Sequence, residues 1–256
     1  MGLMTSSCST AIYSHSQSYT ALKPASQLYA KNSREQKGKL HLKPNVLLIH
    51  GILMNPLEMR YLGSQLEKSG FNVHYVYYQS VLKSPAENAT IIHNKIKQLN
   101  LPNLHLVGHS LGGVLLMHLF DQIKSDDNDI PEGRVVMLGS PVTGSWIAQK
   151  VSEWPIVSPI LAKSMPNALS GVDIPDWNRG RDWGMIAGTK GQGLGLLTGG
   201  LPDVSDGTVL LKETFHPKQK EHIKVNKSHT ALLFSKEVAD LTSHFLTNCS
   251  FKNAQK

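Results

Sequence analysis

Residues 45–50 read NVLLIH, a segment of strand length in which four apolar side chains follow one another with no polar residue between them. A strand with one face in water alternates apolar and polar residues, whereas a strand covered on both faces does not. Uninterrupted runs recur at 133–140 (GRVVMLGS) and 184–189 (GMIAGT). This pattern predicts a parallel sheet that is covered by helices on both faces.

Segments with helical spacing of apolar residues lie between the strand-like runs. The clearest helix start is at Ser84, where a capping serine is followed by Pro85 and by Glu87, the partner in a capping box. The other expected strands are 71–78, 103–108 and 221–226, and the expected helices are 56–68, 84–99, 112–124 and 235–246. Six strands alternating with helices predict an α/β fold with a doubly wound, mostly parallel sheet.

The alternation breaks over residues 141–182, which are rich in apolar residues and prolines and are too long for a simple connection. We interpret this stretch as a cap-like insertion within a domain that spans 44–250. A second irregular segment covers 188–207. Both segments follow the carboxyl ends of strands, which is the edge where open α/β sheets bind ligands.

Residues 1–43 are rich in Ser, Thr, Gln and Lys and show no sustained period, so we expect a flexible basic leader. Six lysines and arginines against one glutamate within 1–44 account for most of the formal net charge of +7. A solvated tail is the plainer interpretation, and peripheral contact with an anionic membrane is the alternative. We do not expect nucleic acid as a partner.

The beginning of the chain lacks the basic and apolar regions of a secretory signal, and no run of about eighteen apolar residues occurs, so we expect a cytoplasmic location. The start MGLMTS loosely fits a lipidation pattern, with Gly2, Ser6 and the nearby Cys8 as candidate sites. Cys8 and Cys249 form neither a metal-ligand spacing nor a disulfide framework. GTKGQGLG at 188–195 matches no nucleotide-binding motif, so we expect no cofactor. No cluster of residues has metal-ligand spacing, so we expect no metal.

The run LHLVGHSLGGV at 104–114 places Ser110 among glycines where a strand ends and a helix begins. This is the context of the nucleophile elbow, in which small neighbours accommodate a strained serine. The amino end of the following helix also stabilises developing negative charge. An ordinary turn is the alternative, and we predict that Ser110 is a catalytic nucleophile.

A serine hydroxyl becomes a good nucleophile only when a base removes its proton, so a histidine is required. Among the 12 histidines, His229 lies in a polar loop between the last strand and the last helix, and we predict it as the base. His216 is the second candidate. His109, inside the elbow, is interpreted as structural, as are the histidines within strands.

The acid that orients this histidine is expected between the serine and the histidine in the chain. Asp206 fits, because it lies in the loop system after the 184–189 strand and the adjacent Gly207 permits a sharp turn. Asp203 stays open as an alternative. A turn aspartate with no catalytic role is the other interpretation of Asp206.

Two backbone N–H groups are expected to form an oxyanion hole. The elbow motif supplies the amide of Leu111, next to the nucleophile. The second donor is expected in the loop after the first strand, where Gly51 permits the chain to turn. We prefer the amide of Ile52 and place Leu53 second.

Together these segments resemble the α/β-hydrolase fold, and within it the small lipase and esterase-like members. The matching segments are HGIL at 50–53, GHSLGG at 108–113, GSPVTGS at 139–145, SDGTV at 205–209 and SHTALLFSKEVADLTSHFL at 228–246. The resemblance covers about residues 45–247 and implies triad roles for Ser110, Asp206 and His229. The chain departs from larger members because it lacks clear first strands.

The resemblance implies an enzyme that cleaves carboxylic esters through an acyl-enzyme intermediate, with a small-molecule ester as its partner. Apolar residues within 141–201 favour an apolar acyl group, unless they only pack the insertion. An acyltransferase or a thioesterase on the same scaffold is one alternative. A binding module that keeps the fold without the reaction is the other.

Overall fold

The computed structural model describes residues 43–123, 130–152, 174–178 and 180–252. The chain divides into two units, 1–42 and 43–256, and the fold described below is that of the second unit. The predicted leader up to residue 42, with its candidate lipidation sites at Gly2, Ser6 and Cys8, lies outside the described residues. So do residues 153–173 of the predicted insertion.

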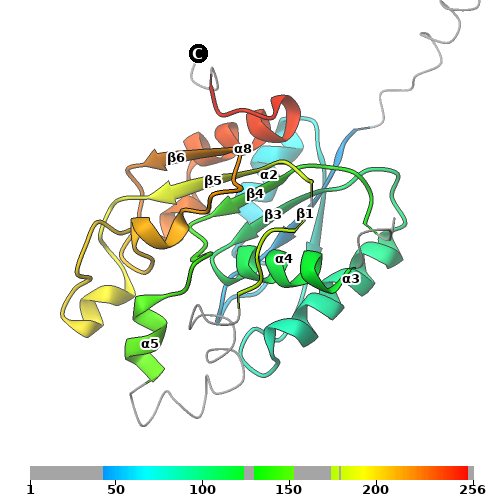
Figure 1. Cartoon of the computed structure of the whole chain (residues 1–256). Helices are drawn as coiled ribbons and strands as arrows, with labels where there is room; N and C mark the ends of the chain where they lie inside the picture. Colours follow the sequence, from blue (N-terminus) through cyan, green and yellow to red (C-terminus); the bar gives the residue numbers. More distant parts are fainter. Residues whose placement is uncertain (1–42, 124–129, 153–173, 179, 253–256) are drawn as a thin grey trace, which may run out of the picture. The chain divides into compact units, whose positions relative to one another are not determined.

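Six parallel strands form one sheet in the order β2-β1-β3-β4-β5-β6 (Figure 1). The strands are β1 (Asn45–Ile49), β2 (Asn72–Val76), β3 (His105–His109), β4 (Val135–Leu138), β5 (Trp183–Gly188) and β6 (Glu221–Val225). The chain runs outward from β1 to β2 and then crosses back to β3 on the other side of β1. The sheet is therefore doubly wound, which confirms the predicted fold class.

Two pairs of helices cover the two faces of the sheet (Figure 1). The helices are α2 (Arg60–Lys68) and α8 (Lys236–Asn248) on one face, and α3 (Pro85–Leu99) and α4 (Leu111–Gln122) on the other. In β1, Val46 and Leu48 pack against the α2 and α8 face, whereas Leu47 and Ile49 pack against the α3 and α4 face. Both sets of side chains are buried, which explains why the strand is apolar at every position.

The helix signal at Ser84 is confirmed, because the Ser84 hydroxyl accepts a bond from the Glu87 amide and the Glu87 carboxylate accepts one from the Ser84 amide. The helix predicted over 56–68 begins later, at Arg60. Its expected first turn closes with i→i−3 bonds instead, from the Met59 N–H to the Pro56 carbonyl oxygen at 3.3 Å and from the Arg60 N–H to the Leu57 carbonyl oxygen at 3.1 Å. The Asn55 amide oxygen caps this turn, because it accepts from the Leu57 N–H at 2.9 Å. Glu58 in turn accepts from the Asn55 N–H at 2.9 Å.

The two irregular segments of the sequence lie in the connections that leave β4 and β5. After β4 comes the short helix α5 (Trp146–Ser152), at the start of the predicted insertion. Three 3₁₀ turns, η1 (Leu194–Thr198), η2 (Leu211–Thr214) and η3 (Thr230–Leu232), occur in the later connections. Within the described ranges, none of the helices has both the length and the apolar character needed to cross a membrane.

Candidate active site

Ser110 is held in a strained backbone conformation between β3 and α4, with φ 53° and ψ −122°. A side-chain-bearing residue rarely adopts this region, so the surrounding structure must enforce it. The glycines permit the close packing that does so. A Cβ on Gly108 would lie 2.6 Å from the Gly113 amide nitrogen, and a Cβ on Gly112 would lie 2.4 Å from the Ile49 carbonyl oxygen.

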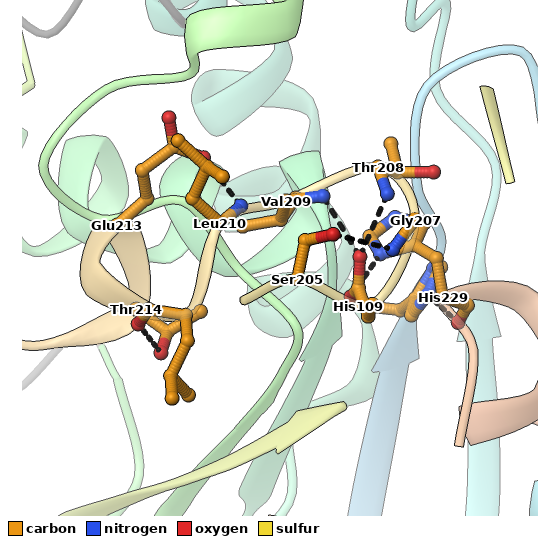
Figure 2. A network of polar contacts seen from close by, with 11 residues as sticks. His109, Ser205, Gly207, Thr208, Val209, Leu210, Glu213, Thr214 and His229 are labelled. Carbon is orange, nitrogen blue, oxygen red and sulfur yellow. Dashed lines mark hydrogen bonds and ion pairs between the residues drawn. The ribbon is translucent and has the colours of Figure 1, made fainter. Parts of the chain in front are cut away.

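The carboxylate of Asp206 meets the ring of His229, with 2.6 Å between Oδ2 and Nδ1. The other oxygen, Oδ1, accepts from the amides of Thr208 at 2.9 Å and Val209 at 2.7 Å. Gly207, at φ 92°, makes the turn that brings these amides round. Asp206 therefore both closes its own turn and aims its second oxygen at the histidine. Figure 2 shows Gly207, Thr208 and Val209 of this turn near His229.

The tautomer of His229 follows from this contact. An ionised carboxylate only accepts hydrogen bonds, so the ring proton lies on Nδ1 and Nε2 is left as the basic nitrogen. The backbone is tied to the same turn, because the His229 N–H donates to the Asp206 carbonyl oxygen at 2.8 Å. Asp206 is 1 % exposed and His229 8 %, so solvent competes little for these bonds.

The structure brings Ser110 and the Asp206–His229 pair to the same edge of the sheet. A Cβ on Gly139 would lie 2.9 Å from Oδ2 of Asp206 and 3.3 Å from Nδ1 of His229, so the end of β4 touches the pair. The ring of His109, directly before the serine, lies tilted at 45° to that of His229, with the ring centroids 4.7 Å apart. Among the described residues, no hydrogen bond joins the Ser110 hydroxyl to His229, and catalytic contacts of this kind often close only around a substrate.

The alternative acid and base lie in other environments. Asp203 accepts from the Val204 amide at 2.7 Å and lies 4.0 Å from the Lys212 ammonium. His216 contacts Asp176, with 3.1 Å from Nε2 to Oδ1. Burial lowers the pKa of His216, whereas the nearby Asp176 raises it. Neither alternative residue contacts the Asp206–His229 pair.

The two preferred oxyanion donors have free backbone N–H groups in the described part of the chain. Neither the Ile52 N–H nor the Leu111 N–H donates a hydrogen bond to any of the described residues. The second choice, Leu53, differs. Its N–H donates to the Ser80 hydroxyl at 3.1 Å, and its backbone has a positive φ of 57°. The geometry thus favours Ile52 over Leu53.

The loop after β1 is anchored by the segment that follows β2. The Tyr78 hydroxyl donates to the His50 carbonyl oxygen at 2.5 Å, and the two rings stack with centroids 4.1 Å apart. Burial lowers the pKa of His50, so this ring is favoured in its neutral form. Together with the Ser80 contact, these interactions fix the backbone beside the candidate oxyanion donors.

Glu213 was missed by the sequence reasoning. Its side chain is buried, and its two carboxylate oxygens accept from the Trp146 amide at 2.6 Å and the Leu210 amide at 2.8 Å. Burial raises the pKa of this carboxyl above its ordinary value, and the two amides act in the opposite direction. No sequence pattern marks it, because it lies in an irregular connection and its partner at Trp146 is far away in the chain.

A hollow of about 420 Å³ lies beside this carboxylate, where α5 begins. It is lined by Thr143, Gly144, Ser145, Trp146, Gln149, Leu210, Lys212 and Glu213. In the described ranges, no three or more histidine, cysteine, aspartate or glutamate side chains are grouped so that they could hold a metal ion.

No protein-family model and no curated protein matches this sequence. The structure is similar to that of the mature Bacillus licheniformis lipase, with a TM-score of 0.58 and 18% identity over 75% of this chain and 86% of that one. An extracellular α/β-hydrolase of a Paenibacillus species is similar with a TM-score of 0.55 and 16% identity, over 78% of this chain and 97% of that one. A monoacylglycerol lipase of Paleococcus ferrophilus is similar with a TM-score of 0.54 and 15% identity, over 81% of this chain and 96% of that one. These likenesses show that the chain has the α/β-hydrolase fold.

Proposed function

We propose that this protein hydrolyses carboxylic esters through an acyl-enzyme formed on Ser110. The observation that carries the proposal is the buried 2.6 Å contact between Asp206 and His229, at the sheet edge where a strained serine follows β3. An aspartate fixed on Nδ1 leaves Nε2 free to act as a base. The lipases and the α/β-hydrolase that share the fold add support for this class of reaction.

In the first half of the reaction, the Ser110 hydroxyl oxygen attacks the ester carbonyl carbon while Nε2 of His229 takes the hydroxyl proton. The negative charge that develops on the carbonyl oxygen is stabilised by the amides of Ile52 and Leu111. The imidazolium then gives the proton to the alkoxide of the leaving alcohol. Asp206 keeps the ring oriented and stabilises its positive charge.

In the second half, His229 takes a proton from water, and the resulting hydroxide attacks the acyl carbon. The second tetrahedral intermediate collapses, the carboxylic acid leaves, and the proton returns to the Ser110 oxygen. Because both intermediates place negative charge on the same oxygen, one pair of amides serves both steps.

We propose a small ester with an apolar acyl group as the substrate. The loops after β1 and β2 expose the side chains of Leu53, Leu57 and Leu82. The connection after β5 exposes Leu194 and Leu196. These loops leave the same edge of the sheet as Ser110, so apolar surface lies on the side from which a substrate approaches.

The test is hydrolysis of p-nitrophenyl esters of increasing acyl length by matched pairs of variants. Asp206→Asn should lower kcat by about 10⁴-fold, because the amide favours the wrong tautomer of the histidine. Asp203→Asn, a change of the same kind in the same loop, should leave kcat near the wild-type value. His229→Gln should abolish turnover, and His216→Gln should not.

Two results would contradict the proposal. One is loss of turnover in Asp203→Asn together with retention in Asp206→Asn. The other is a folded wild-type protein that cleaves no ester of the series. That result would favour an acyltransferase, a thioesterase or a binding module without catalytic activity.

A further inference from the structure

His109 occupies the centre of the candidate site without a role in the proposed reaction. It ends β3 directly before Ser110, and its side chain is 1 % exposed. Its Nε2 lies 3.1 Å from the backbone carbonyl oxygen of His229, 120 residues further along the chain. A Cβ on Gly51 would lie 3.1 Å from its Nδ1, so the ring also touches the loop after β1.

The hydrogen-bond partners define the state of this ring. A carbonyl oxygen only accepts, so Nε2 of His109 carries the proton and donates it to His229. Nδ1 is buried and has no hydrogen-bond partner among the described residues. Burial, and secondarily the nearby His229, hold the pKa of His109 well below its ordinary value, so the ring is neutral.

We propose that His109 is a positioning residue that fixes the backbone of His229 relative to Ser110. The inference rests on the proposed function. The His229 N–H is held by the Asp206 carbonyl oxygen, and its C=O is held by His109, so the backbone is anchored on both sides of the base. Figure 2 shows His109 and His229 beside the turn that carries Val209 and Thr208. Because His109 and Ser110 are adjacent in the chain, this bond connects the base directly to the nucleophile's own strand.

A packing role and a positioning role for His109 predict opposite effects of a phenylalanine at this position. If His109 only filled space, phenylalanine would be the better residue, because it removes the buried Nδ1 that has no partner. If the bond from Nε2 matters, phenylalanine leaves the His229 carbonyl unpaired and its loop less well fixed. The order of activity among variants therefore separates the two roles.

The experiment compares His109→Phe, His109→Gln and His109→Asn in the full chain. The amide nitrogen of glutamine lies as many bonds from Cα as Nε2 of histidine does, so glutamine can replace the donor. The amide nitrogen of asparagine lies only as far from Cα as Nδ1 does. We expect Phe and Asn to lower kcat for p-nitrophenyl ester hydrolysis by about 10²-fold with little change in KM, the size of effect that a small misplacement produces. Gln should recover most of that loss.

A second measurement does not depend on turnover. The proton between Nδ1 of His229 and Asp206 should give a low-field NMR resonance in the wild type and in His109→Gln. It should broaden through exchange with water in His109→Phe. Melting temperatures of the three variants show whether a change in kcat follows stability instead.

The inference is overturned if His109→Phe is as active as His109→Gln with the resonance intact, or if kcat falls only in proportion to the melting temperature. It also fails if the resonance is the same in all three variants. Should the wild type cleave no ester, the proposed function fails. The resonance would then still report whether His109 fixes His229.

Discussion

At the scale of single residues, the candidate site depends on one strained serine and on the glycines that make room around it. A non-glycine residue at a positive φ costs about 1–3 kcal/mol, which the rest of the fold must offset. Among Gly108, Gly112 and Gly113, a Cβ on Gly112 would come closest to backbone atoms. A Cβ there would lie 2.4 Å from the Ile49 carbonyl oxygen and 2.7 Å from that of His50. Both oxygens belong to backbone, so neither can move away at little cost.

Gly112→Ala should therefore lower the free energy of unfolding by about 1–3 kcal/mol or more, as overpacking in a core does. Activity should fall as well, because the displaced residues lead into the loop with the Ile52 amide. Gly180→Ala is the matched control, since nothing lies within 4 Å of a Cβ at that exposed position. Urea unfolding of the two variants measures the difference, and equal stabilities would show that the elbow is not tightly packed.

At the scale of elements, Glu213 joins the start of α5 to the connection that carries Asp206. One oxygen of its carboxylate accepts from the Trp146 amide and the other from the Leu210 amide. Its own carbonyl oxygen accepts from the amide and the hydroxyl of Thr143. Figure 2 shows Glu213 beside Leu210, in the same network as the Asp206 turn. A substitution at Glu213 should therefore alter both the start of α5 and the connection that carries Asp206.

The pH dependence of stability tests this buried carboxylate. Its folded-state pKa is raised above the ordinary value of 4.5, chiefly by burial, with Asp206 adding to the shift and Lys212 opposing it. The folded protein then holds this proton more tightly than the unfolded chain. The contribution to stability is complete below the unfolded-state pKa and is lost as pH rises through the folded-state pKa.

We expect the stability of the wild type relative to Glu213→Gln to decrease as pH rises above the ordinary carboxyl pKa of 4.5, because the folded-state pKa of Glu213 is raised. Denaturant unfolding at several pH values measures the difference. Glu237→Gln removes a partly exposed carboxylate paired with Lys227 and serves as the control for loss of an acidic group. A difference in the free energy of unfolding between wild type and Glu213→Gln that stays constant as pH rises above 4.5 would contradict the assignment.

At the scale of the whole described domain, the parallel sheet brings residues that are distant in sequence to one edge. Ser110 follows β3, Asp206 follows β5 and His229 follows β6. The fold was predictable because uninterrupted apolar runs leave few alternatives to a strand covered on both faces. The start of α2 was not predictable, because the N–H groups of Met59 and Arg60 make i→i−3 bonds, and the spacing of apolar residues does not distinguish such a tightened turn from α-helix.

The candidate site was predictable only where it depends on local pattern. The motif singles out Ser110, and the loop after β6 singles out His229. Asp203 and Asp206 share a loop, and the 2.6 Å contact between Oδ2 of Asp206 and Nδ1 of His229 shows which carboxylate faces the histidine. The contacts of His109 and Glu213 join distant segments, so no spacing in the sequence could reveal them.

The central claim is that Ser110 is an activated nucleophile, and covalent labelling of the full chain with a fluorophosphonate tests it most directly. We expect intact-mass spectrometry to show a single adduct that peptide mapping assigns to Ser110. The adduct should be absent from Ser110→Ala and should form far more slowly in His229→Gln. A folded wild-type protein that takes up no label, or an adduct that persists in Ser110→Ala, would contradict the account.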